Sequence, residues 1–182
     1  MKAFLKEQNK ILDDLKIVHH SINLNLIRNK ENLIKKKPSG FPNYKNVELE
    51  TFIDYKYNGS IIPLGEIYNL IGIDVDNKQD TINKYNIICE DQEINMDTLT
   101  VETVNKGYHY YYKLTKKQKD KLKNFNSSND MLYNLKIDVK YNNQCFFGPS
   151  YISFEEDIYK YNIINYTEIA LLPCLQFCYK PI

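Results

Sequence analysis

The segment Leu70-Ile71-Gly72-Ile73-Asp74-Val75-Asp76 decides how this chain is interpreted, because an apolar run ends there in two acids one residue apart. Successive side chains of a β-strand point to opposite faces of a sheet, so Asp74 and Asp76 share one face while Ile73 and Val75 share the other. The apolar face predicts an anchor in a hydrophobic core. The two carboxylates repel each other unless a cation lies between them, and oxygen ligands of this kind suit Mg²⁺ or Mn²⁺. The segment therefore predicts a buried strand that presents a metal-binding pair.

The composition is that of a folded globular domain. The chain has 182 residues, of which 43% are hydrophobic, and this length suffices for one well-buried domain or for two small lobes around a cleft. Only 6 Gly and 6 Pro argue against long low-complexity segments. The net charge of +1 excludes a polyanion-binding surface over the whole molecule, so any contact with nucleic acid must come from local basic patches. Two such patches are Lys35-Lys36-Lys37 and Lys116–Lys123, and charge alone favours solvent-exposed loop or helix faces for both.

The cysteines predict a reducing, intracellular environment. Cys89, Cys145, Cys174 and Cys178 show no disulfide framework, and no signal peptide opens the chain. Cys174 and Cys178 are spaced for one side of a helix, but no third ligand nearby completes a zinc site, so buried free thiols are favoured over a metal site. The segment Met1–Arg28 is amphipathic and interrupted by charges, and this pattern predicts neither a secretion signal nor a membrane span.

Apolar periodicity and turn signals predict a mixture of helices and strands without an internal repeat. Helices are expected over Met1–Arg28 (one helix or a pair), Val47–Tyr57, Thr81–Cys89, the lysine-rich segment that leads to Asn124–Asp130, and Tyr166–Tyr179. Strands are expected over Ser60–Ile62, Leu70–Asp74, Thr98–Thr103, Tyr108–Leu114, Met131–Tyr141 and Gln144–Phe147. The turn Asn105-Lys106-Gly107 joins two of these strands as a hairpin, and Asn142-Asn143 is a turn between the last two. This mixture predicts an α+β fold rather than a regular βαβ array.

Two later segments carry groups that complement the acidic pair. Gly107-Tyr108-His109 begins a strand after a tight turn, and Lys136-Ile137-Asp138-Val139-Lys140 places a third acid between two lysines on one strand face. A metal-dependent nucleotidyl transferase uses carboxylates to hold two cations about 3.5–4 Å apart. A histidine can donate a hydrogen bond to a triphosphate oxygen, and a lysine beside the third acid neutralises phosphate charge. Gly107 supplies the backbone freedom that a close phosphate approach favours.

In order and spacing, these motifs resemble the primase-polymerase (prim-pol) branch of the archaeo-eukaryotic primase superfamily, which occurs in viruses, plasmids and phages. That family is marked by an acid-x-acid strand, a small residue-x-His motif and a hydrophobic strand with a third acid. The corresponding residues here are Asp74 and Asp76, then Gly107 and His109, then Asp138. Flanking segments are similar as well, namely Pro42 with its preceding lysines, Ile62–Gly65, Thr103–Tyr111, Asp138–Ser150 and Ala170–Leu175. The resemblance extends over the chain from about Lys35 onward.

The resemblance implies a DNA-dependent primase or polymerase that transfers nucleotides from nucleoside triphosphates on a single-stranded DNA template in DNA replication. By the same resemblance, the catalytic metal ligands are Asp74, Asp76 and Asp138, which would hold two Mg²⁺ or Mn²⁺ ions. The implied nucleotide contacts are His109, Lys140, Gly107 and Ser150. The implied fold is an antiparallel, RNA-recognition-like catalytic sheet beside an N-terminal α/β unit, with the active site in the cleft between them.

The resemblance also sets expectations for organisation and partners. We expect a single primase-polymerase domain over residues 1–182, with an N-terminal helical segment over 1–34 and a catalytic core over 35–182. A helicase domain or protein is the expected partner beside DNA and nucleotides, and no membrane partner is expected. The expected location is intracellular, at sites of DNA replication, in the host cytoplasm or a viral factory if the protein is viral.

Three positions depart from the family pattern. Gly107 stands where many relatives carry serine, Lys106 where many have a second glycine, and Lys140 where arginine is common. A lysine keeps the positive charge but loses the bidentate fork of arginine. The expected consequence is weaker phosphate binding rather than loss of activity.

Three alternatives start from the same residues. Leu70–Asp76 also resembles the first motif of haloacid-dehalogenase-type phosphatases, but Lys78 stands where those enzymes have Thr or Val, and their motif lies near the N-terminus. A calcium loop is disfavoured because Lys78 occupies a position that needs an oxygen ligand and no glycine follows. The third alternative is a catalytically inactive primase-like module that binds DNA or nucleotides, and the clustered acids argue against it because they are costly to keep without a cation.

Overall fold

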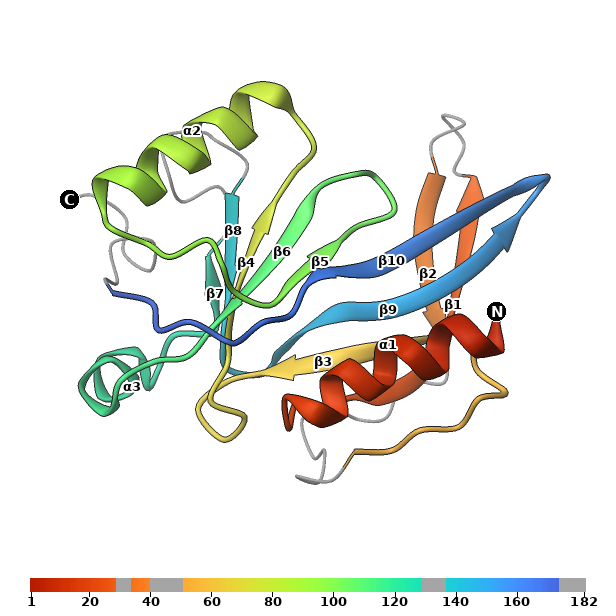
Figure 1. Ribbon diagram of the computed structural model, residues 1–182, viewed down its shortest axis with the longest axis horizontal. Coiled ribbons are helices and arrows are strands. Elements are labelled where there is room, and N and C mark those ends of the chain that lie inside the picture. Colours follow the sequence, from red (N-terminus) through yellow and green to blue (C-terminus); the bar gives the residue numbers. More distant parts are fainter. Residues whose placement is uncertain (29–33, 40–50, 129–136, 174–182) are drawn as a thin grey trace.

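The computed structural model describes residues 1–28, 34–39, 51–128 and 137–173 (Figure 1). Its helices are α1 (Lys2–Asp14), α2 (Gln79–Asp91) and α3 (Lys116–Leu122). Its strands are β1 (His20–Arg28), β2 (Ile34–Ser39), β3 (Gly59–Leu64), β4 (Ile71–Val75), β5 (Thr100–Glu102), β6 (Tyr108–Tyr112), β7 (Ser127–Ser128), β8 (Ile137–Lys140), β9 (Gln144–Phe154) and β10 (Asp157–Asn165). The expected α+β class is confirmed.

The strands form one curved, antiparallel sheet in the order β2-β1-β3-β9-β10-β5-β6-β4-β8-β7. Figure 1 shows that α1 lies along the half that contains β3 and β9, while α2 lies over the half that contains β4 and β8. Each helix covers the apolar side of its own half, so the curved sheet has two hydrophobic cores. A strand of this sheet can therefore contribute to a core on one face and to a site on the other.

The core beneath α2 confirms the expected anchor of the acidic strand. Ile71, Ile73 and Val75 of β4 are completely buried, and α2 contributes Tyr85 and Cys89 to the same cluster. Burying one aliphatic side chain of this size stabilises the fold by about 1.5–3 kcal/mol. Asp74, on the opposite face of β4, therefore lies between two residues that are anchored in this core.

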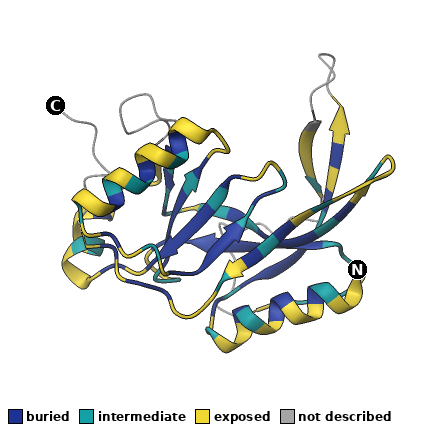
Figure 2. Ribbon diagram, turned by 45° about the horizontal axis from the view of Figure 1, so that its top comes forward, coloured by how far each residue is buried: buried dark blue, intermediate teal, exposed yellow. Residues whose placement is uncertain are grey.

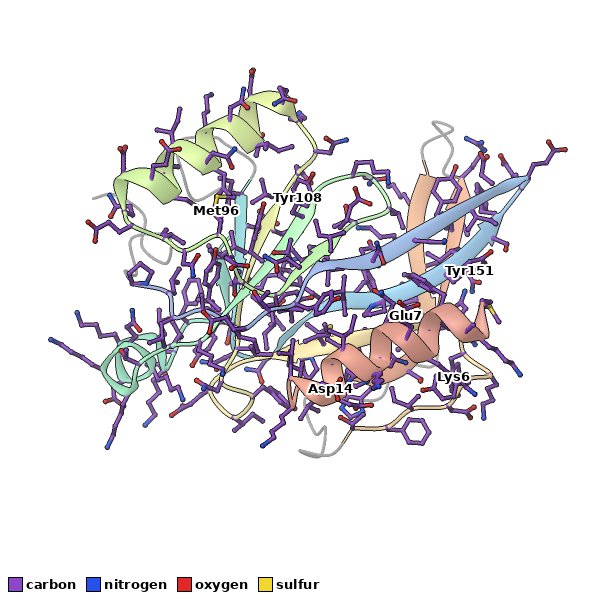
Figure 3. All side chains as sticks on the ribbon, viewed as in Figure 1. Lys6, Glu7, Asp14, Met96, Tyr108 and Tyr151 are labelled. Carbon is purple, nitrogen blue, oxygen red and sulfur yellow. The ribbon has the colours of Figure 1, made fainter. Side chains whose placement is uncertain are left out.

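The core beneath α1 ties the N-terminus to the last strands of the chain. Leu12 of α1 belongs to the second hydrophobic cluster, and the Oε1 atom of Gln8 accepts a hydrogen bond from the backbone N–H of Ile163, at 2.6 Å. Tyr151 of β9, labelled in Figure 3, lies beside the same helix, with its ring centroid 6.1 Å from that of Phe4. This packing fixes α1 on one side of β9 and β10 and leaves the other side for different contacts.

Strand β1 changes partners midway and so forms a ribbon that leaves the sheet. Residues His20–Ile22 pair with β3, and Asn23–Arg28 pair with β2. Figures 1 and 2 show this ribbon rising beside the long β9–β10 hairpin. Near its end, the Nε and Nη2 atoms of Arg28 donate hydrogen bonds to the two carboxylate oxygens of Glu155, each at 2.7 Å. We call the ribbon formed by residues 23–28 and 34–39 the arm.

The expected helix over Met1–Arg28 is wrong beyond Asp14, and with it the expectation of a wholly helical segment over 1–34. Helix α1 ends at Asp14, and Lys16 then adopts a left-handed conformation with φ of 57°. After this turn, Ile22, Leu24 and Leu26 alternate as the buried residues of β1. A period of two is the signature of a strand, and it outweighs the weaker helical spacing that extends from the preceding segment.

Two other expected helices are wrong within the described residues. Residues 51–57, the described part of the expected helix over Val47–Tyr57, form no helix, and Phe52 instead bridges to His20. Residues 166–173 also form no helix, and Leu171 bridges to Lys113 beside β6. The remaining residues of that segment, including Cys174 and Cys178, lie outside the described residues, as do Pro42 and Lys136.

The predicted hairpin between β5 and β6 is confirmed. So are the helix that was expected over Thr81–Cys89, which is α2, and the strands that correspond to β3, β4 and β8. The turn at Asn142-Asn143 instead leads from β8 in one half of the sheet to β9 in the other, and these two strands are not neighbours. Strand β10 was not predicted. Among the described helices, none is long and apolar enough to cross a membrane.

Candidate active site

Three polar residues from distant parts of the sequence lie side by side across three strands. Asp74, in β4, is the direct cross-strand partner of His109 in β6 on one side and of Asp138 in β8 on the other. Directly opposite residues in a sheet project to the same face, with neighbouring strands about 4.7–4.9 Å apart. The sheet therefore gathers a histidine and two carboxylates in one row. We call these residues the central row.

A second row runs parallel to the first, one pleat away on the same face. Gly72 of β4 is the cross-strand partner of Tyr111 on one side and of Lys140 on the other. A side chain at Gly72 would collide with the Cε2 atom of Phe146, which reaches over from β9. The absence of a Cβ atom thus lets an aromatic ring from the other half of the sheet lie against this face.

His109 is a buried, neutral base. Its ring stacks on Phe146 with centroids 4.2 Å apart and planes 18° from parallel, and its exposed fraction is 3%. Burial lowers the pKa of His109 well below its usual value, and the positive charges of Lys36 and Lys140 lower it further. Its Nε2 atom lies 3.6 Å from Oδ1 of Asp74, which is too long for a hydrogen bond. The buried Nδ1 atom has no hydrogen-bond partner among the described residues, so the imidazole keeps an unsatisfied ring nitrogen.

The negative charge of Asp74 is only partly offset by nearby positive charges. A quarter of its side chain is exposed, but the loss of surrounding water raises its pKa, and the positive charges of Lys140 and Lys36 act in the opposite direction. Asp138 is half-buried beside it. A raised carboxylate pKa means that the ionised form lacks sufficient stabilisation, and a bound cation would supply it.

Asp76 comes directly after the last residue of β4 and is exposed. Its charge acts on Lys36, as that of Asp74 does. Within the described ranges, no group of three or more His, Cys, Asp or Glu side chains is close enough to hold a metal ion.

Close backbone contacts, which could not be predicted from the sequence, explain why residue 107 is a glycine. A Cβ atom there would lie 2.6 Å from the carbonyl oxygen of Val75 and 3.0 Å from the backbone nitrogen of Asn77. Glycine thus allows the β5–β6 turn to approach the end of β4, where Asp76 lies. The preceding residue, Lys106, adopts a φ of 66°, the conformation in which glycine is preferred. This explains physically why glycine suits the position that Lys106 occupies.

Ser150 lies within the sheet. It is completely buried, and its hydroxyl donates a hydrogen bond to the carbonyl oxygen of Gly148, at 3.0 Å. Its cross-strand neighbours are Gly59 in β3 and Tyr161 in β10. Its hydroxyl is therefore already engaged by the backbone.

Two positive groups lie near the central row, and only one was predicted as a site residue. The ammonium of Lys140 lies 5.2 Å from the ring centroid of Phe146, on which His109 stacks. Lys36, on the arm, lies 5.6 Å from the ring centroid of Tyr161. The lysine run at 35–37 was the available signal, but charge alone could not distinguish an inward lysine from solvated ones. Phe146 and Tyr161 carry no signal of their own in the sequence.

The comparisons with known proteins agree with the motif resemblance. A family model described as "Prim-Pol: Bifunctional DNA primase/polymerase, N-terminal" matches residues 42–174. The match includes both rows described above. No curated protein matches the chain.

Proposed function

Because the chain belongs to the Prim-Pol family of bifunctional DNA primase/polymerase N-terminal domains, we propose that it catalyses template-directed nucleotidyl transfer from nucleoside triphosphates on single-stranded DNA. The family implies nucleotidyltransferase activity in general. One observation carries the specific proposal: Asp74 lies in register between His109 and Asp138 on a single face of the sheet. This arrangement supports the proposal, because the reaction needs carboxylates for cations beside a group that can contact phosphate.

The donor set fits a hard divalent cation such as Mg²⁺ or Mn²⁺. Asp74 and Asp138 are carboxylates on adjacent strands, and the raised pKa of Asp74 indicates a charge that a cation would stabilise. In our proposal these two residues hold the metal, and Asp76 joins them from the end of β4. Bound there, divalent ions would polarise the α-phosphate and offset the negative charge of the reactants.

The remaining groups bind and orient the nucleotide. In the proposed reaction, the oxygen of a primer 3′-hydroxyl forms a bond to the α-phosphorus, the bond from that phosphorus to the β-phosphate oxygen breaks, the hydroxyl proton passes to water, and pyrophosphate leaves. Neutral His109 donates a hydrogen bond to a phosphate oxygen, and the stack on Phe146 fixes the direction of its ring. Lys140 offsets charge on the β- and γ-phosphates. Positioning of this kind is the main source of rate enhancement in phosphoryl transfer.

Nucleotide incorporation on a primed single-stranded template, with Mg²⁺ or Mn²⁺, tests this proposal. We expect Asp74→Asn and Asp138→Asn each to abolish detectable extension, and His109→Ala to reduce it by about 10²-fold or more, because a preorganised donor to the reacting phosphate is worth that much. The matched control is Asp120→Asn, which removes an exposed acid of α3 and should extend primers at the native rate.

The result separates catalysis from simple binding. Extension by the native chain that persists in both aspartate variants would refute the assigned site. If the native chain extends nothing, and the aspartate variants bind single-stranded DNA as it does, the protein is a binding module of the primase type and the catalytic proposal is wrong.

A further inference from the structure

Lys36 points inward from the arm, and its two lysine neighbours point outward. Lys36 is the cross-strand partner of Leu26, which is buried, with an exposed fraction of 4%. Lys35 faces Ile27, which is 41% exposed. Because side chains alternate along a strand, Lys35 and Lys37 share the outer face of the ribbon and Lys36 lies on the inner one. The arm therefore presents one specific lysine to the sheet.

The ammonium of Lys36 reaches aromatic residues that adjoin the central row. It lies 5.7 Å from the ring centroid of Phe147 and 5.6 Å from that of Tyr161. The Tyr161 ring centroid is in turn 5.8 Å from that of His109. In the strand order, β10 with Tyr161 and β8 with Lys140 lie on opposite sides of β6, which carries His109. Lys36 and Lys140 thus approach the histidine from opposite sides.

Neither lysine has a carboxylate partner in the described part of the chain, since no ion pair within 4.0 Å involves Lys36 or Lys140. Lys36 as a whole residue is exposed, but protein atoms surround its ammonium, and this desolvation lowers its pKa. The charge of Asp74 acts in the opposite direction, and that of Lys140 adds to the effect of burial. Asp74 acts on both lysines, but from beyond ion-pair distance, so an anion bound between the two ammonium groups would add stabilisation.

We propose that Lys36, Lys140 and His109 together bind the triphosphate of the incoming nucleotide, with Lys36 closing the site from the arm. This inference rests on the proposed function and adds to it a residue that lies outside the matched segment 42–174. The triphosphate is favoured over a nucleic-acid backbone because Lys36 lies over Tyr161, whose ring adjoins His109 in the central row. A backbone strand lying along the outside of the arm would instead meet Lys35 and Lys37.

The test measures equilibrium binding of a nucleoside triphosphate and of inorganic tripolyphosphate to the native chain and to Lys36→Met. Methionine keeps most of the apolar stem over Phe147 and Tyr161 and removes only the charge. We expect both dissociation constants to rise at least about tenfold, as the loss of one charge-assisted contact predicts. Lys36→Arg, which restores the charge, should recover most of the affinity. The matched controls Lys35→Met and Lys37→Met should bind both ligands within about twofold of the native chain.

The outcomes distinguish this inference from the proposed function. Native affinity for tripolyphosphate in Lys36→Met would overturn the inference, and so would a loss confined to single-stranded DNA binding, which would make the arm a nucleic-acid contact. If Lys36→Met loses tripolyphosphate binding while the native chain extends no primer, the inference holds and the catalytic proposal fails. If the native chain binds neither nucleotide nor tripolyphosphate, both are overturned.

Discussion

Replacing Gly72 with alanine should damage the site without touching any of its charged groups. The new Cβ atom would overlap Cε2 of Phe146 and come within 2.8 Å of Cδ2 of the same ring and 2.9 Å of Cδ1 of Leu64. Carbon atoms pack favourably at about 3.5–4.0 Å, so the ring must move by roughly 1 Å. Overpacking of this kind costs about 1–3 kcal/mol of unfolding free energy.

The same movement should reduce activity more than stability. The ring of Phe146 contacts two site residues. Its centroid lies 4.2 Å from that of the His109 ring and 5.2 Å from the ammonium of Lys140. A displacement of about 1 Å in positioning groups can cost about 10²-fold in rate. We therefore expect Gly72→Ala to unfold at a lower urea concentration and to extend primers about two orders of magnitude more slowly, measured at a temperature where the variant is fully folded.

A second substitution separates the clash from the lost stack. In Gly72→Ala combined with Phe146→Leu, the smaller side chain removes the clash and should restore part of the stability, but the aromatic support of His109 is gone and activity should stay low. The reasoning is refuted if Gly72→Ala alone keeps native stability within about 0.5 kcal/mol and extends primers at the native rate, because Phe146 would then have room that the contacts do not allow.

Three further predictions concern the surroundings of the site. Burial lowers the pKa of His19 and of His20 below 6.5, so below that pH the unfolded chain binds more protons than the folded one. The free energy of unfolding should therefore be full above pH 6.5 and fall as the pH drops, by up to about 1.4 kcal/mol per pH unit for each histidine. Urea unfolding at pH 7.5 and 5.5 should show a larger loss of stability in the native chain than in the double variant His19→Gln/His20→Gln. Glu155→Gln weakens the exposed ion pair with Arg28, so amide hydrogen exchange of the arm should accelerate while exchange in β4 stays constant, and equal rates in the arm would show that the pair does not hold it. Thr98→Val removes a buried hydroxyl that donates to the carbonyl oxygen of Tyr111, at 2.5 Å, and accepts from the backbone N–H of Ala170, at 3.0 Å; we expect a loss of about 1–3 kcal/mol in urea unfolding, and an unchanged midpoint would contradict it.

The parts of the fold that could be predicted are those with a clear period. Strand β4 places Ile71, Ile73 and Val75 on one face and Asp74 on the other, and the core beneath α2 confirms this division. Helix α1 was extended too far because His20–Arg28 follows it without Gly or Pro to mark the change. Only the left-handed conformation at Lys16 separates the two elements, and lysine gives no sequence signal for it.

The three residues of the central row could be predicted from the order of the motifs, but their surroundings could not. Motif order indicated Asp74, His109 and Asp138, yet nothing local indicates that Phe146 crosses from the other half of the sheet to stack on His109. Lys36 depends on a change of partner in the middle of β1, and sequence patterns do not encode which strands pair at long range.

The two faces of β4 have different roles, so the strand is sensitive to any shift in its pairing with its neighbours. Because its side chains alternate, a slip of one residue in the pairing of β4 with β6 and β8 would turn Asp74 into the core beneath α2 and bring Ile73 to the opposite face. A buried, uncompensated carboxylate and an exposed isoleucine would both be unfavourable. A register error in this strand would thus cost stability as well as function, so the buried face of β4 selects the pairing that also forms the site.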